Sequence, residues 1–228
     1  MTLAHFLVIS GESNEENKVL SSFPEKHCEI LGNINGIERI DLYKPASFDD
    51  PLPGDDHGPL LTIQSFYRDR QSLETGLNSS EFRSLINKLE EDALRDMSHD
   101  VLEVKFFPVE NDEHIREWKA PVSYVVRYHH PCDDLDTFVD FYLENHPQIE
   151  RKFPGIQNII CYVPTEWTDS TNIRRCDYML GNEVIFESTD ALGMALTSPI
   201  MDEMAADFEN FPSFGRNTHF AMERIQLF

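Results

Sequence analysis

Two kinds of side chain that could do chemistry occur twice in this chain at one spacing. His27 and His146 stand 119 positions apart, and so do Tyr43 and Tyr162. A histidine titrates near neutral pH, which suits a general acid or base, and a tyrosine hydroxyl can hydrogen-bond a substrate oxygen or stabilise an enolate. The structural alternatives are a histidine that caps a helix and a tyrosine that packs in the core. Two copies of one fold would keep such residues for either reason.

A charged residue also interrupts an apolar stretch. Arg127 stands within residues 124–128 (YVVRY), whereas Val8 holds the position 119 residues earlier. A strand-centre arginine needs a carboxylate partner, so we expect an ion pair with Glu183, whose counterpart is Gln64. An anion-binding pocket is the functional alternative. This asymmetry predicts that any site belongs to the second half of the chain.

A ligand pocket needs apolar walls and a few convergent polar groups. His219, on the last predicted strand, is one further polar candidate, and several aromatic residues are candidates for the walls. The candidate catalytic residues are therefore His146, Tyr162 and Arg127, and the candidate ligand-binding residues are Glu183, Tyr128, Phe186, Trp167, His219, His27 and Tyr43.

Metal and nucleotide sites are not predicted. His129 and His130 precede Cys132 and Asp133, but adjacent residues of a strand point to opposite faces, so the two histidines cannot easily share one ion. The four cysteines form no C-x-x-C pair and are expected to be free thiols. The chain has no glycine-rich phosphate loop and no nucleophile elbow. We therefore expect no cofactor.

The elements that must position these residues repeat. Residues 5–109 align with 124–228 without a gap, which predicts domains at 1–109 and 124–228 joined by a linker at 110–123. Apolar periodicity, prolines and glycines predict the individual elements. The predicted strands are 5–10, 37–43, 60–67, 101–109, 124–128, 157–163, 179–186 and 218–227, and the predicted helices are 14–33, 72–94, 135–152 and 189–208, the last with a break at Ser198-Pro199.

The order β-α-β-β-α-β in each copy is the ferredoxin-like arrangement. One such unit has helices on only one face of its sheet, and the predicted strands are largely apolar on both faces. We therefore expect the two sheets to pack face to face. The fold class is α+β, with two ferredoxin-like repeats that form a dimeric-type α+β barrel within one chain.

Several stretches of the second copy resemble the EthD family, whose members are small proteins of the dimeric α/β-barrel superfamily. The first runs from Phe141-Tyr142 through His146-Pro147 to Pro154-Gly155-Ile156. The others are residues 186–199, with Ser188 leading into a helix, and the acidic-aromatic residues 207–211. The first copy keeps His27, Gly36 and Tyr43 but departs elsewhere, including Cys28 for the proline.

This resemblance implies metal-free and cofactor-free chemistry on hydroxylated aromatics, lactones or polyketide-like rings, such as isomerisation, cyclisation, decarboxylation or oxygenation. We expect a small cyclic or aromatic ligand between a sheet and its helices. His146 would be the proton shuttle, Tyr162 the hydrogen-bond donor and Arg127 the orienting group. A non-enzymatic binding protein and an assembly protein of the same fold are the alternatives, because such barrels often build larger homo-oligomers.

The composition limits the partners. The chain has 41 acidic against 19 basic residues, a net charge of −22, spread evenly over both copies. Nucleic acids and anionic membrane surfaces need basic patches, so neither is expected as a partner. No apolar run reaches the roughly 18 residues of a membrane span, and residues 1–5 do not resemble a secretion signal. We expect a cytoplasmic protein.

Overall fold

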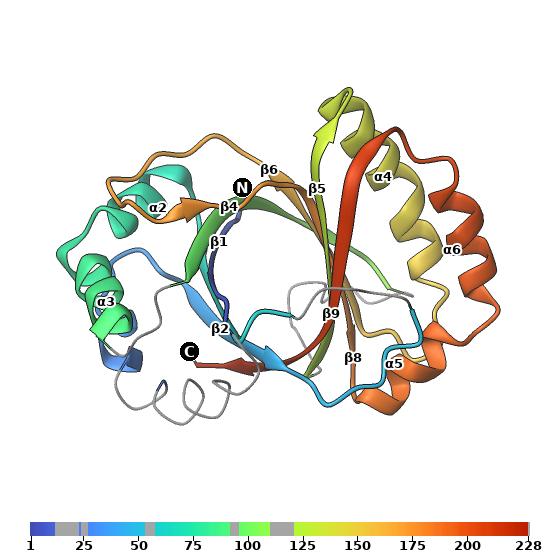
Figure 1. The fold of residues 1–228 in the computed structure, drawn as a ribbon, viewed down its shortest axis with the longest axis horizontal. Helices are drawn as coiled ribbons and strands as arrows, with labels where there is room; N and C mark the ends of the chain where they lie inside the picture. Colours follow the sequence, from blue (N-terminus) through green and yellow to red (C-terminus); the bar gives the residue numbers. More distant parts are fainter. Residues whose placement is uncertain (12–22, 24–26, 53–57, 92–95, 110–120, 228) are drawn as a thin grey trace.

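The chain folds into a closed barrel of antiparallel strands with helices on two sides (Figure 1). The computed structural model describes residues 1–11, 23, 27–52, 58–91, 96–109 and 121–227. Its barrel strands are β1 (Leu3–Ile9), β2 (Arg39–Pro45), β3 (Leu61–Tyr67), β4 (Met97–Phe107), β5 (Val122–Cys132), β6 (Asn158–Pro164), β8 (Tyr178–Phe186) and β9 (Phe214–Gln226). They follow one another in the order β1-β3-β2-β9-β5-β8-β6-β4, and β4 pairs with β1 to close the barrel.

The two halves of the chain meet along the edges of their sheets. The first half (residues 3–107) contributes β4-β1-β3-β2, and the second half (residues 122–226) contributes β9-β5-β8-β6. Antiparallel pairs β2–β9 and β4–β6 join them. The α+β barrel predicted from the sequence is confirmed, but its sheets do not pack as separate layers. Edge strands carry unpaired N–H and C=O groups, and pairing the edges satisfies them.

Helices cover the barrel on two opposite sides (Figure 1). α2 (Arg70–Leu77), α3 (Ser80–Glu91) and helical residues 27–32 cover the first half. α4 (Leu135–Glu150), α5 (Thr189–Leu196) and α6 (Ile200–Phe208) cover the second half. Among the described residues, no helix is long and apolar enough to cross a membrane.

Side chains that accept backbone hydrogen bonds decide where the helices begin. Asp69, Asp134 and Ser188 each accept one from the N–H three positions later, at the starts of α2, α4 and α5. Ser79 does the same at the start of α3. The single helix predicted over 72–94 is therefore two helices.

Other differences from the expected elements are small. The break predicted at Ser198-Pro199 lies between α5 and α6. A short extra strand, β7 (Arg174–Arg175), pairs parallel to β4 and has no place in the predicted order. Residues 110–120 of the predicted linker and most of the helix predicted over 14–33 lie outside the described residues.

Two glycines occupy matching turns that lead into β2 and β6. Gly36 has φ +89° and Gly155 has φ +76°, a left-handed conformation that costs glycine little and other residues more. A Cβ at Gly36 would also lie 3.0 Å from the Cβ of Ser72. These turns explain why glycine recurs 119 residues apart.

Alternation along the strands separates two kinds of core. In β1, Leu3, Leu7 and Ile9 pack in the cluster under the helices of the first half, whereas Ala4 and Phe6 point into the barrel. We call the interior set the barrel plug. Its buried members are Ala4, Phe6, Val8, Phe66, Leu102, Val104, Ile160, Tyr162 and Ile185.

Each half also sends a segment onto the other. Phe48 and Leu52, which follow β2, pack against the core of the second half, and Asp50 accepts a hydrogen bond from the Tyr124 hydroxyl at 2.8 Å. Trp167, which follows β6, packs in the core of the first half. The barrel is therefore held by side-chain packing across the halves as well as by strand pairing.

Candidate functional site

A cavity of about 410 Å³ lies inside the barrel, toward the ends of β1 and β5. Val8 of β1 and Ser10 just after it border the cavity, and Arg127 and His129 border it from β5. The lining residues are Phe6, Val8, Ser10, Tyr43, Pro59, Thr62, Ser98, Val125, Arg127, His129, His130, Arg174, Cys176, Asp177, Tyr178, Arg216, Thr218, Phe220 and Met222.

This location differs from the one expected from the sequence, between a sheet and its helices. The space under the helices is filled by large apolar clusters on both sides of the barrel. Side chains buried in these clusters are closely packed, as protein interiors are. The interior is less completely filled, so the hollow forms among the residues that point inward.

Arg127 stands in the wall of the cavity among aromatic rings. Its guanidinium carbon lies 4.9 Å from the ring centre of Phe6, 5.3 Å from that of Tyr162 and 5.8 Å from that of Tyr178. Cation–π attraction to three rings offsets part of the cost of burying the charge, and the side chain is 6% exposed. The guanidinium is therefore held in a fixed place beside the cavity.

A hydrogen-bonded group of polar side chains lies in the barrel behind Tyr43, which itself lines the cavity. The Glu183 side chain accepts from the Tyr43 hydroxyl at 3.0 Å, from Ser123 at 2.6 Å and from Tyr162 at 2.7 Å. The Gln64 amide donates to the Tyr162 oxygen at 3.0 Å. Glu183 and Gln64 are fully buried. The structure thus brings together Tyr43, Tyr162 and Glu183 of the predicted site.

The two tyrosines of this group stay protonated. Burial, followed by the nearby Glu183, raises the pKa of both Tyr43 and Tyr162 well above its ordinary value. Their hydroxyls can therefore donate hydrogen bonds over the physiological pH range but cannot act as phenolates.

The predicted ion pair between Arg127 and Glu183 does not form. Nη1 of Arg127 donates to the carbonyl oxygen of Val126 at 2.9 Å and to that of Asn182 at 3.3 Å. Glu183 is instead satisfied by the three hydroxyls. A pair of opposite charges on neighbouring strands was expected to meet, but backbone carbonyls and aromatic rings hold the guanidinium away.

His146 lies outside the barrel, between α4 and α6. Its Nδ1 lies 2.7 Å from the Asp207 carboxylate, its Nε2 lies 3.8 Å from Glu150, and its ring packs on Tyr142 at 4.7 Å. It is 6% exposed and does not line the cavity. The contacts of His146 join two helices, and its role as proton shuttle stays a prediction.

Four other predicted ligand-binding residues also lie away from the cavity. Tyr128 packs in the aromatic cluster under α4, and Phe186 packs under α5. His219 faces outward, 3.8 Å from Asp50. His27 is fully buried beneath the first half's sheet and stacks on Phe23. The three that lie on strands point to the face opposite to the barrel interior.

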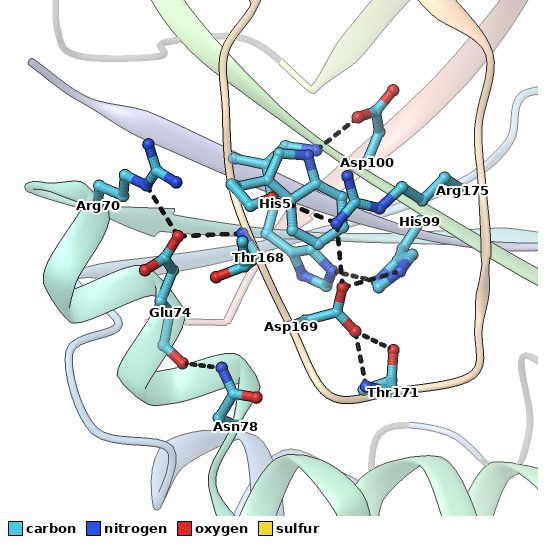
Figure 2. Close-up of polar contacts among 12 residues, drawn as sticks. His5, Arg70, Glu74, Asn78, His99, Asp100, Thr168, Asp169, Thr171 and Arg175 are labelled. Carbon is cyan, nitrogen blue, oxygen red and sulfur yellow. Dashed lines mark hydrogen bonds and ion pairs between the residues drawn. The ribbon is translucent and has the colours of Figure 1, made fainter.

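Trp167 marks a second polar cluster, also outside the cavity. His5 and His99 approach to 3.3 Å through Nε2 and Nδ1, and Asp169 lies 4.0 Å from His99 and 3.5 Å from Arg175, which stacks on the Trp167 ring (Figure 2). Burial lowers the pKa of His99 to about 4 and that of His5 well below its usual range. Neutral histidines packed this tightly anchor the segment after β6.

The sequence interpretation missed the residues at the mouth of the cavity. His129, His130, Arg174 and Arg216 all border it. A register shift between Tyr128 and His129 interrupts the alternation of β5, so both histidines reach the same opening. Within the described part of the chain, no group of three or more histidine, cysteine or acidic side chains could hold a metal ion. The chain is acidic overall, so the sequence signal that could have pointed to these residues was the few basic side chains of its second half.

No family model matches the sequence, and no curated protein matches it as a relative. Solved structures do match. An anthrone oxidase-like protein has a TM-score of 0.63 and 10% identity over 98% of this chain and 91% of its own. A candidate monooxygenase from Lactobacillus acidophilus NCFM has a TM-score of 0.56 and 9% identity over 99% and 95%.

These likenesses define a class by fold alone. The chain has the fold of the dimeric α+β barrel proteins, here closed within one polypeptide. An EthD-family protein from Bacillus halodurans C-125 aligns with 44% of this chain and 95% of its own, at 18% identity and a TM-score of 0.36. The EthD relationship therefore stays a proposal, and the activity must be argued from the cavity.

Proposed function

We propose that this chain is a tandem, EthD-like barrel that binds a small cyclic or aromatic compound in its interior cavity. One observation carries the proposal. The cavity is of the size that small ligands use, and its wall combines rings and aliphatic groups with polar and charged groups from several strands. The ungapped spacing of 119 residues and the matching strand orders of the two halves support the tandem origin.

Binding is the central claim, and turnover is the further one. Cofactor-free acid/base chemistry needs a group that exchanges protons beside the ligand, and His146 does not reach the cavity. His129 does, with its Nε2 3.0 Å from the Thr218 hydroxyl. His129 replaces His146 as the proposed proton-transfer residue. Tyr43 replaces Tyr162 as the tyrosine nearest the ligand, and its oxygen can accept a hydrogen bond while its hydroxyl donates to Glu183.

The test is direct binding of neutral oxygenated aromatics: phenol, 1-naphthol and anthrone, titrated by calorimetry. Val125→Trp would fill the cavity from its wall. Met194→Trp adds the same ring on an exposed position of α5. We expect saturable one-to-one binding to the unmodified protein and to Met194→Trp, and loss of binding in Val125→Trp.

The proposal would be contradicted if none of the three compounds binds saturably. It would also be contradicted if a compound binds to Val125→Trp as tightly as to the unmodified protein. Circular dichroism checks that both variants fold. If Val125→Trp does not fold, Val125→Phe serves in its place.

A further inference from the structure

The charged residues around the cavity are distributed unlike those of the rest of the chain. All of them come from the second half. Residues 122–228 hold seven basic residues and 17 acidic ones, yet three of the basic residues and one acidic residue, Asp177, line the cavity. The three are Arg127, Arg174 and Arg216. A hollow of this charge in a protein of net charge −22 favours an anion.

The three arginines have different places. Arg216 and Arg174 are exposed at the opening, and Arg174 lies 3.7 Å from Asp96. Arg127 is buried in the wall among the rings. The arginines at the opening can attract an anion, but only Arg127 can contact a ligand that is buried away from water. A charged hydrogen bond is strongest in such a buried place.

The surroundings of Arg127 orient it for a ligand. Among the described residues, both of its hydrogen bonds are donated by Nη1, to backbone carbonyls, so Nε and Nη2 remain available as donors. The neighbouring strand β8 has a glycine, Gly181, paired with Arg127, and this leaves room for the guanidinium. A Cβ at Gly181 would lie 3.0 Å from Nη1 and 3.3 Å from Cζ of Arg127.

Two carboxyl groups inside the barrel, those of Glu183 and Asp100, are already engaged. Glu183 accepts from three hydroxyls. Asp100, on the inward face of β4, accepts from the N–H of Val101 at 2.8 Å, and the Trp167 indole also donates to it. Burial raises the pKa of Asp100 to about 7, which weakens its hold on a neighbouring cation near neutral pH.

We infer that the ligand of this cavity is an aromatic or cyclic carboxylate, with the ring against Phe6, Tyr178 and Phe220 and the carboxylate on the guanidinium of Arg127. This inference rests on the proposed function and adds the charge of the ligand to it. A carboxylate presents two oxygens in the plane that a guanidinium matches. The arginines at the opening raise the local concentration of the anion.

The experiment compares 1-naphthoate with 1-naphthol, two ligands that share a ring system and differ in charge. We expect the unmodified protein to bind 1-naphthoate at least about tenfold more tightly, as charged hydrogen bonds allow. Arg127→Met keeps the length of the side chain and should remove this preference while leaving 1-naphthol binding within about twofold. Arg83→Met, which removes the same charge from an exposed position of α3, is the matched control and should keep the preference.

The outcomes separate the two ideas. Equal affinity for both compounds in the unmodified protein overturns the carboxylate inference and leaves the proposed function standing, whereas binding of neither contradicts the proposed function. A preference that survives Arg127→Met but is lost in the double variant Arg174→Met/Arg216→Met overturns the assignment to Arg127. If Arg127→Met does not fold, the side-chain ¹⁵Nε resonance of Arg127 in the unmodified protein should shift with 1-naphthoate and not with 1-naphthol, and an unshifted resonance overturns the inference.

Discussion

The two ends of the barrel interior contrast sharply. Near the starts of β1 and β5, Phe66, Leu102 and Ile185 of the barrel plug fill the interior with apolar volume. Near the ends of those strands, Arg127 and His129 border a cavity. An eight-stranded barrel is just wide enough for side chains to fill it, so whether it holds a ligand depends on which side chains point inward. One end of this barrel is built for stability and the other leaves space.

The largest loss of stability is expected at the end of the barrel that the plug fills. Ile185→Ala removes buried methyl groups from the plug and should lower the free energy of unfolding by about 2–5 kcal/mol. Val125→Ala at the cavity wall should cost only about 1 kcal/mol, because the atoms removed already border open space. Urea denaturation measures both. Equal losses would mean that the two ends do not differ in packing.

Asp100 lies between the two ends of the barrel interior, and its titration should make the stability of the fold depend on pH. Its pKa in the folded protein is about 7, against an ordinary value of 3.8. As the pH rises from about 4 to 7, the unfolded chain therefore releases this proton first, and the free energy of unfolding falls by up to about 1.4 kcal/mol per pH unit. Above about pH 7 this contribution is constant.

Asp100→Asn should flatten this slope, measured by urea denaturation at several pH values. Asp202→Asn, on the exposed surface of α6, is the matched control and should leave the slope unchanged. The same slope in both variants would show that Asp100 does not carry the effect.

His146→Ala tests whether the helix layer belongs to the site. Loss of the hydrogen bond to Asp207 should cost about 1–3 kcal/mol of unfolding free energy, while binding of 1-naphthol and 1-naphthoate stays within twofold. Thermal melts and calorimetry on the same samples separate the two readouts. Weakened binding with an unchanged melting temperature would return His146 to the ligand site.

The smallest effect is expected in the polar group behind the cavity. Glu183→Gln keeps an oxygen that can accept from the tyrosine hydroxyls and should cost about 1 kcal/mol. Glu183→Leu leaves Tyr43, Tyr162 and Ser123 without that acceptor and should cost more, measured by the same denaturation. A leucine variant as stable as the glutamine variant would mean that these hydrogen bonds add little.

Local sequence features predict many of the strands and turns that form both ends of the barrel. Strand periodicity predicts β1 and β8 closely, and the glycines at positions 36 and 155 recur because their turns need a left-handed residue. The break in the helix predicted over 72–94 was missed. A single serine hydroxyl at Ser79 caps the new helix, and apolar spacing does not register such a cap.

The candidate site was predictable in part. Tyr43 and Tyr162 were chosen because they recur 119 residues apart, and Arg127 and Glu183 because charged groups interrupt apolar strands. The structure places all four in the barrel interior. His146 was chosen by residue type and resemblance, and its partner Asp207 lies 61 positions away on another helix. Sequence spacing cannot foresee a partner that only the packing of α4 on α6 supplies.

The sequence by itself determined most of the elements and their order, because local hydrogen bonding and the alternation of side chains act over a few residues. It also determined the excess of acid from which the basic cavity stands out. Only the tertiary structure decided that the sheets join at their edges and that the hollow lies inside the barrel. The reason is physical: both faces of these strands are apolar, and which face packs completely depends on the sizes of side chains brought together from distant strands.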